Sequence, residues 1–148
     1  MKARELMTEN PECVSEQDTV ERAAQLMRQL NVGLIPVVDD ANSRRLRGVI
    51  TDRDITIRHV AEGHDTSDCK VGEAMTRERL YTVTPDDDDS TVMARMREGQ
   101  VRRIPVVEGD RIVGIIAQAD LAIQTPDSKA EEVERTIEKI SEPARPQR

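Results

Sequence analysis

The chain has 148 residues, of which 36 % are hydrophobic and 1 % aromatic, and its formal net charge is -7. A chain this acidic lacks the broad basic surface that binding to DNA or RNA requires, so we expect no nucleic-acid partner. It contains no apolar run of about eighteen residues and no signal-peptide pattern. We therefore expect no membrane span and a cytoplasmic location.

The first half of the chain predicts a helix, a β-hairpin and a second helix. Asp18 followed by Glu21 resembles a capping box, and the apolar spacing behind it predicts a helix over residues 19–30. The β-branched runs 35–38 and 49–50, joined by a polar loop, predict a hairpin. Apolar residues that recur after Asp54 predict the second helix.

The second half predicts the same elements again. Ile35-Pro36-Val37-Val38 recurs 69 residues later as Ile104-Pro105-Val106-Val107, and Gly48 recurs after 66 residues as Gly114. The first copy thus has three extra residues in its hairpin loop, where insertions are tolerated. In the second copy, the acidic run Asp86 to Asp89 opens the helix, and we interpret it as a solvated helix start rather than a cation site.

These repeats predict an α/β (α+β) fold in which each copy is strand, helix, strand, strand, helix. A repeat of about sixty residues buries little surface alone, so we expect the two to share one core with pseudo-two-fold symmetry. The domain boundaries that we predict are repeat 1 at 1–62, a linker at 63–69, repeat 2 at 70–125, and a C-terminal helix and tail at 126–148.

The C-terminal segment predicts one further helix. Ser128 with Glu131 forms a capping-box pattern, and Val133, Ile137 and Ile140 give a narrow apolar stripe. That stripe covers either its own module or a neighbouring subunit.

Residues that could carry chemistry are few. Cys13 and Cys69 form no CxxC pair, and we expect ordinary thiols, with a disulfide as the alternative. His59 and His64 match no common zinc spacing, so we expect no metal site, although a metal or redox role stays open. Without a set of acid, base and nucleophile, we expect no catalytic residues and no enzyme.

The ordered motifs resemble a known family. Met7-Thr8 and Met75-Thr76, the Ile-Pro-Val-Val strand and the Gly-Val-Ile-Thr-x-x-Asp end, which runs from Gly48 to Asp54, are similar to those of the CBS domain in its tandem form, the Bateman module. The likeness covers residues 3–125 and is greatest to small stand-alone bacterial CBS pairs of the hypoxic response protein type.

This resemblance implies two clefts between the repeats for adenosyl compounds such as AMP, ADP, ATP or S-adenosylmethionine, with no cofactor required. In the first cleft, it assigns phosphate to the Thr51 hydroxyl and ribose to the Asp54 carboxylate, which suits their hydrogen-bonding capacity. Its other wall is expected from Leu80, Val101, Arg102, Arg103 and Ile104. The arginines would hold phosphate, or alternatively they form an exposed pair that balances nearby acids.

The second cleft departs from the family pattern. Asp120 keeps the ribose partner, but Ala117 replaces the hydroxyl residue, and the facing wall is Val32, Gly33 and Leu34 with no basic group. We expect this cleft to bind nucleotide weakly or to be empty. Asp54 and Asp120 also have a purely structural interpretation, as stabilisers of helix N-termini.

Two classes of function follow from this sequence. The first is a nucleotide-sensing regulatory module without catalysis that signals to an unknown effector protein, as a homodimer by family resemblance. The alternative is a ligand-independent stress-response or interaction protein with vestigial nucleotide clefts.

Overall fold

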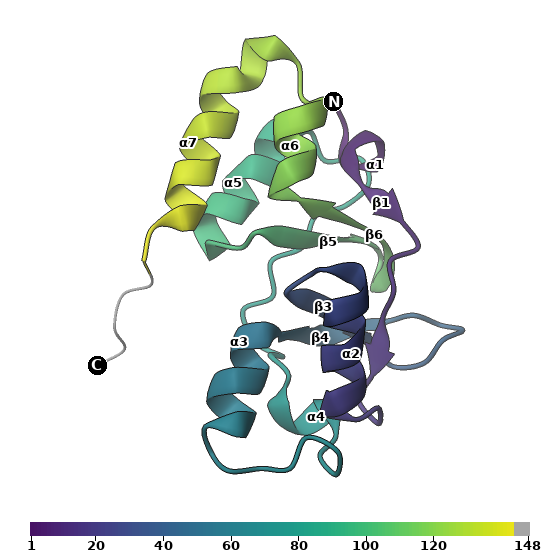
Figure 1. Ribbon diagram of the computed structural model, residues 1–148. Helices are drawn as coiled ribbons and strands as arrows, with labels where there is room; N and C mark the ends of the chain where they lie inside the picture. The colour runs from purple at the N-terminus through teal and green to yellow at the C-terminus, as the bar shows by residue number, and fades with distance from the viewer. Residues whose placement is uncertain (144–148) are drawn as a thin grey trace. The chain divides into compact units, whose positions relative to one another are not determined.

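The computed structural model describes residues 1–143 (Figure 1), and the chain forms two compact units. Unit 1 comprises Met1–Glu9, Tyr81–Glu108 and the chain from Val113 onward, and unit 2 comprises Asn10–Leu80 with Gly109–Ile112. Residues 144–148 of the predicted tail lie outside the described part. The units thus do not coincide with the halves of the chain.

Unit 2 contains a three-stranded sheet in the order β2-β3-β4. β2 runs parallel to β3, and β3 runs antiparallel to β4 with Leu34 opposite Thr51. The strand, helix, strand, strand, helix order predicted for the repeat is confirmed. Its elements are β2 (Val14–Ser15), α2 (Val20–Leu30), β3 (Leu34–Val38), β4 (Leu46–Thr51), α3 (Asp52–Asp54), the π-helix η1 (Ile55–Val60) and α4 (Val71–Ala74).

Unit 1 contains the second sheet, in the order β1-β6-β5. The first strand expected in this repeat is reduced to a single parallel bridge between Val83 and Val106. Two small sheets with several helices confirm the α/β fold class. The elements are α1 (Ala3–Leu6), β1 (Thr8–Glu9), α5 (Asp89–Gly99), β5 (Arg103–Glu108), β6 (Arg111–Ala117), α6 (Gln118–Gln124), the 3-10 helix η2 (Asp127–Lys129) and α7 (Ala130–Ser141).

Each sheet is extended by the segment that precedes the other repeat. β1 at the start of the chain pairs antiparallel with β6, with Thr8 opposite Ile115. In the same way, Thr76, which precedes repeat 2, bridges Val49 of β4. This exchange explains why the units do not follow the chain halves.

Two helix starts differ from the sequence prediction. The N-cap of α2 is Thr19, whose hydroxyl accepts from the Arg22 N–H at 3.1 Å, whereas Asp18 accepts from the Ser15 N–H at 2.8 Å. α7 begins after a 3-10 turn, with Lys129 at the N-cap and no side-chain cap. The capping boxes predicted at Asp18 and Ser128 are therefore wrong, because the preceding turns use these positions.

The acidic residues at the start of α5 have different structural roles. Asp88 caps the helix by accepting from the Thr91 N–H at 2.8 Å. Asp89 is 3 % exposed and lies 3.3 Å from the Met1 amino group and 3.6 Å from the Lys129 ammonium. The solvated interpretation is therefore wrong for Asp89, which is a buried carboxylate with cationic partners.

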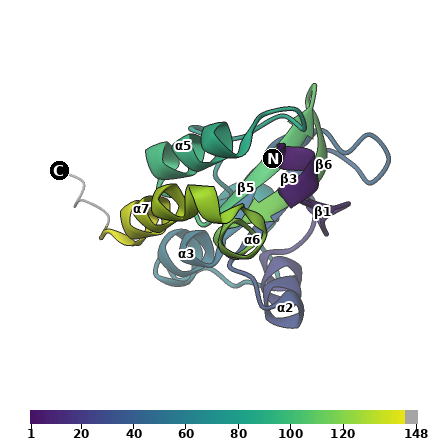
Figure 2. The same ribbon diagram turned by 90° about the horizontal axis from the view of Figure 1, so that it is seen from above.

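Buried apolar side chains form two clusters, one in each unit, and a core shared by the two repeats stays a prediction. In unit 1, two segments outside the repeat add buried apolar side chains to the cluster. Ala3 and Leu6 come from α1, and Val133 and Ile140 come from α7. α5 and α7 lie side by side (Figure 2). The α7 stripe therefore covers its own unit.

Within residues 1–143, none of the helices has the length and apolar character that crossing a bilayer requires.

Candidate functional site

The turn from Thr51 to Asp54 joins β4 to the helical segment that follows and is closed by reciprocal hydrogen bonds. The Thr51 hydroxyl accepts from the Asp54 N–H, and Asp54 Oδ2 accepts from the Thr51 N–H, each at 3.0 Å. This is a capping box in which the aspartate takes the place usual for glutamate. The pair that sequence analysis assigned to a ligand thus also stabilises the start of a helix.

Asp54 has two further partners that the sequence analysis did not assign. The Thr76 hydroxyl lies 3.1 Å from both carboxylate oxygens, and Arg58 Nε lies 3.8 Å from Oδ1. Arg58 follows Asp54 by four residues, a spacing that favours an ion pair on a helix, and this signal was available in the sequence. Asp54 is 8 % exposed, so most of its hydrogen-bonding capacity faces the protein.

The turn from Ala117 to Asp120 in unit 1 has the same backbone arrangement with fewer contacts. Asp120 Oδ2 accepts from the Ala117 N–H at 2.8 Å. Ala117 has no hydroxyl to cap the turn, and among the described contacts Asp120 has no counterpart of the threonine and arginine that surround Asp54. Asp120 is also more exposed, with intermediate burial.

In each turn, a backbone N–H donates to the residue that precedes the neighbouring strand, β3 or β5. The Asp52 N–H donates to the Gly33 carbonyl, and the Gln118 N–H donates to the Arg102 carbonyl, both at 2.9 Å. Inside its own unit, therefore, the Thr51 turn lies next to an uncharged strand start, and the Ala117 turn lies next to an arginine.

The predicted site residues divide between the units. Unit 2 holds Thr51, Asp54, Leu80, Val32, Gly33 and Leu34, and unit 1 holds Val101, Arg102, Arg103, Ile104, Ala117 and Asp120. Leu80 lies in the same unit as Thr51, which it was predicted to face. Apart from Leu80, each predicted cleft draws its two walls from different units, so the pairing of walls stays a prediction. Arg102 is exposed and Arg103 is half-buried, whereas Ile104 is buried in the core of unit 1.

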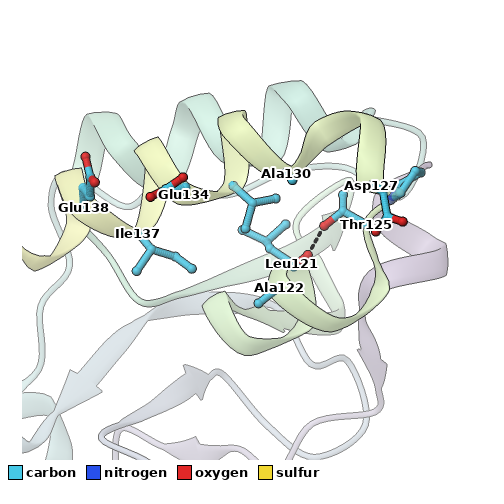
Figure 3. Close-up of a pocket in the computed structure, with 10 residues that line it drawn as sticks. Leu121, Ala122, Thr125, Asp127, Ala130, Glu134, Ile137 and Glu138 are labelled. Carbon is cyan, nitrogen blue, oxygen red and sulfur yellow. Dashed lines mark hydrogen bonds between the residues drawn. The ribbon is translucent and has the colours of Figure 1, made fainter.

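A pocket of about 470 Å³ lies between α6 and α7, as Figure 3 shows. Its lining includes the apolar side chains Leu121 and Ile137 and the carboxylates Asp127, Glu134 and Glu138, and it contains no basic side chain. Such a lining repels phosphate, so this pocket is a poor candidate for a nucleotide. None of the predicted site residues lines it.

Both cysteines are free thiols. Burial raises the pKa of Cys13 to about 11, with a smaller opposing effect of Arg44. At neutral pH the thiol is therefore protonated and weakly nucleophilic.

Comparison with known proteins identifies the repeats. The CBS domain family matches residues 3–59 and again residues 71–123. Hypoxic response protein 1 of Mycobacterium tuberculosis is 38 % identical over 125 residues, which is 84 % of this chain and 85 % of that protein. The CBS domain-containing protein YhcV of Bacillus subtilis is 39 % identical over 120 residues, or 81 % and 82 % of the two chains.

Solved structures agree with these matches. Hypoxic response protein I, crystallised with two coordinated zinc ions, superimposes with a TM-score of 0.77 at 37 % identity, covering 85 % of this chain and all of that one. The CBS pair of protein MJ0100, in complex with 5′-methylthioadenosine and S-adenosyl-L-methionine, gives 0.70 at 24 % identity, covering 82 % and 93 %. The second likeness concerns the fold alone.

Proposed function

Because this chain belongs to the CBS domain family, we propose that it is a stand-alone regulatory module of the cytoplasm that binds an adenosyl nucleotide such as AMP, ADP or ATP and signals to an effector protein without catalysis. We further propose that it acts as a homodimer. The ligand class is supported by the family and by the adenosyl ligands of MJ0100, which shares the fold.

The Thr51 turn is the observation that carries this proposal. The Thr51 hydroxyl accepts one hydrogen bond from Asp54 and, among the described contacts, donates none. Its proton is therefore available for an anion such as a phosphate oxygen. Arg53, which is exposed on the same turn, adds a positive charge nearby.

Asp54 retains capacity for a ribose hydroxyl. An ionised carboxylate offers about four acceptor positions, and the Thr51 N–H and the Thr76 hydroxyl use two or three of them. If the Thr76 hydroxyl turns away, Oδ1 can accept from a ligand. Arg102 and Arg103 supply the phosphate contacts in this proposal, and the cleft of Ala117 and Asp120 binds more weakly.

A second candidate is supported by the same contacts. Since Asp54 is buried and already bonded to Thr51 and Thr76, the turn has a complete structural role without any ligand. A ligand-independent interaction protein with vestigial clefts fits this observation.

Thermal shift and isothermal titration calorimetry on the full chain, with AMP, ADP, ATP and S-adenosylmethionine at millimolar concentration, separate the two candidates. A ligand that binds only the folded state stabilises it by about 2.7 kcal/mol at a concentration of 100 times Kd, so the melting temperature should rise. No shift and no heat with any of the four would favour the ligand-independent protein.

The site assignment is tested by Thr51→Val and by Arg102→Ala with Arg103→Ala. Thr51→Val keeps the branched shape and removes the hydroxyl, so affinity for the bound nucleotide should fall about tenfold, the effect of one hydrogen bond to a charged group. Arg22→Ala, an exposed arginine on α2, is the control and should change nothing. Unchanged affinity in the test variants would mean that the wrong cleft was chosen, and two equivalent AMP sites would contradict the weak second cleft.

A further inference from the structure

The pocket between α6 and α7 lies largely outside the part of the chain that matches the CBS domain family. The second match ends at residue 123. Every lining residue except Leu121 and Ala122 lies beyond that point, on the turn between the two helices or on α7. The volume of about 470 Å³ is within the usual range for ligand-binding pockets. What this pocket binds therefore has to be inferred from its own lining.

The apolar side chains of the lining are only partly covered. Leu121 and Val133 belong to the buried cluster of unit 1, and Ile137 packs against that cluster while half-buried. Ala122 on α6 and Ala130 on α7 are small and exposed, so they leave room above the larger side chains. An apolar side chain of a partner can occupy that space and be removed from water.

The charged side chains of the lining are all acidic. Asp127, Glu134 and Glu138 are exposed, and within residues 1–143 none of the three forms a salt bridge. Glu134 and Glu138 are four residues apart on α7 (Figure 3), so they share one face of the helix about 6 Å apart along its axis. Like charges at this spacing repel each other, and a cationic partner would relieve that repulsion.

The basic side chains near the pocket do not neutralise these acids. The Lys129 ammonium lies 3.6 Å from the Asp89 carboxylate on α5. The Lys139 ammonium lies 2.9 Å from the Glu142 carboxylate. Arg135 is exposed on α7, and neither it nor the two lysines line the pocket. The pocket is therefore complementary in charge to a basic partner.

We propose that the α6–α7 pocket is the docking surface for an amphipathic helix of the effector protein, one that presents leucine-like side chains to the pocket and lysine or arginine beside them. The existence of an effector rests on the proposed function, whereas the chemistry of the contact rests on the pocket alone. Docking needs no nucleotide, because none of the residues predicted to bind one lines this pocket.

A helix suits the pocket because two helices form its sides. A third helix that lies along two others inserts side chains spaced three and four residues apart. Residues 130–138 of α7 extend for about 12 Å along the helix axis, which matches about two turns of a partner helix. The long stems of lysine and arginine pack on apolar surface while their charged ends reach outward, so one partner helix contacts both the apolar side chains and the carboxylates.

The test uses a synthetic peptide of about fifteen residues, long enough to form a helix, with leucines three and four residues apart on one face and lysines on both sides of them. Fluorescence anisotropy measures its binding to the full chain without nucleotide, and amide chemical shifts in NMR spectra map the contact. We expect saturable binding that weakens as salt is added, with shift changes concentrated on α6 and α7.

Charge reversal in the pocket tests the acidic side chains. Glu134→Lys with Glu138→Lys changes two exposed residues and should weaken peptide binding by about tenfold or more, because two attractions become repulsions. The matched control, Glu62→Lys with Glu98→Lys, makes the same change in net charge at exposed positions outside the pocket. It should weaken binding by less than about twofold, because salt screens distant charges.

A second peptide tests the apolar part of the contact. Replacing its leucines with serine keeps every lysine and removes the apolar face. This peptide should bind at least about tenfold more weakly, because it buries far less apolar surface.

Three results would overturn the proposal. Equal binding of the serine peptide, or equal weakening by both charge reversals, would show a general attraction to an acidic chain. Shift changes outside α6 and α7 would assign the contact to another surface. A mass of the chain alone that rises with concentration in light scattering, and no longer does so in Glu134→Lys with Glu138→Lys, would assign the pocket to a second copy.

The outcome is separable from that of the nucleotide titrations. If AMP or ATP binds and the leucine peptide does not, the docking surface is wrong and the proposed function stands. If the leucine peptide binds at the pocket and no nucleotide binds, the docking surface stands and the ligand-independent interaction protein is favoured.

Discussion

The turns Thr51–Asp54 and Ala117–Asp120 share one backbone design and differ in what surrounds it. In each, the aspartate accepts from the first N–H of the turn, at 3.0 Å and 2.8 Å. The N–H of the second residue donates to the residue that precedes the neighbouring strand, at 2.9 Å. The Thr51 turn adds the contacts of Thr76 and Arg58. The two turns thus share their backbone geometry, whereas the Ala117 turn has fewer side-chain contacts.

This difference has opposite consequences for structure and for binding. The additional partners make Asp54 more important for stability and leave it less free for a ligand. Asp120 has more free acceptor capacity but lacks the adjacent hydroxyl that would hold an anion. The three predictions below each change one copy and then the other.

The largest difference in stability between the two copies is expected at their equivalent glycines, Gly48 and Gly114. A Cβ on Gly48 would lie 2.3 Å from the backbone oxygen of Thr76, whereas one on Gly114 would lie 2.3 Å from the flexible Met7 Sδ. Because a side chain can move aside and a paired backbone cannot, Gly48→Ala should destabilise the fold by about 3 kcal/mol and Gly114→Ala by about 1 kcal/mol. Urea unfolding of both variants measures the difference, and equal losses would contradict it.

The aspartates should differ by less. Asp54→Ala leaves the Thr51 N–H and the Thr76 hydroxyl without their acceptor, and should cost about 2–3 kcal/mol. Asp120→Ala removes one hydrogen bond at a more exposed position and should cost about 1 kcal/mol. Chemical unfolding at neutral pH is the measurement. If Asp120→Ala lowered the free energy of unfolding more than Asp54→Ala does, the contacts of Asp54 with Thr51 and Thr76 would not be what stabilises the fold.

The smallest effect concerns the cap. The backbone of Ala117, with φ -101° and ψ 158°, closely resembles that of Thr51, with φ -113° and ψ 161°. Ala117→Thr should therefore supply the missing cap and stabilise the fold by about 0.5–1 kcal/mol, and Thr51→Ala should destabilise it by about 1 kcal/mol. Thermal denaturation checks both, and a destabilising Ala117→Thr would show that the two turns are not interchangeable.

Much of the fold could be read from the sequence because the repeats carry strong local signals. The β-branched runs at 35–38 and 104–107 predicted strands that the structure confirms, and the apolar spacing placed α2 and α5. Helix caps were less predictable, since several polar residues precede each helix and only the path of the preceding turn decides between them. Thr19 rather than Asp18 caps α2 for this reason.

The candidate site was partly predictable. The capping pair Thr51 and Asp54 follows from spacing alone, and so does the ion pair with Arg58. The Thr76 contact could not be predicted, because it joins residues 22 apart in the sequence. The stacking of the His59 and His64 rings could not be predicted either, because it depends on the path of the turn that follows the π-helix, where the His64 N–H donates to the His59 carbonyl.

The sequence by itself determined the duplication, the order of elements in each copy, the family, and which turn keeps its hydroxyl. These are local properties that depend on residue type and spacing. Tertiary structure alone decided that each copy's leading segment joins the other copy's sheet, that the apolar side chains form two clusters, and that Asp54 is enclosed by Thr76. Those outcomes depend on contacts between distant segments, which no local pattern specifies.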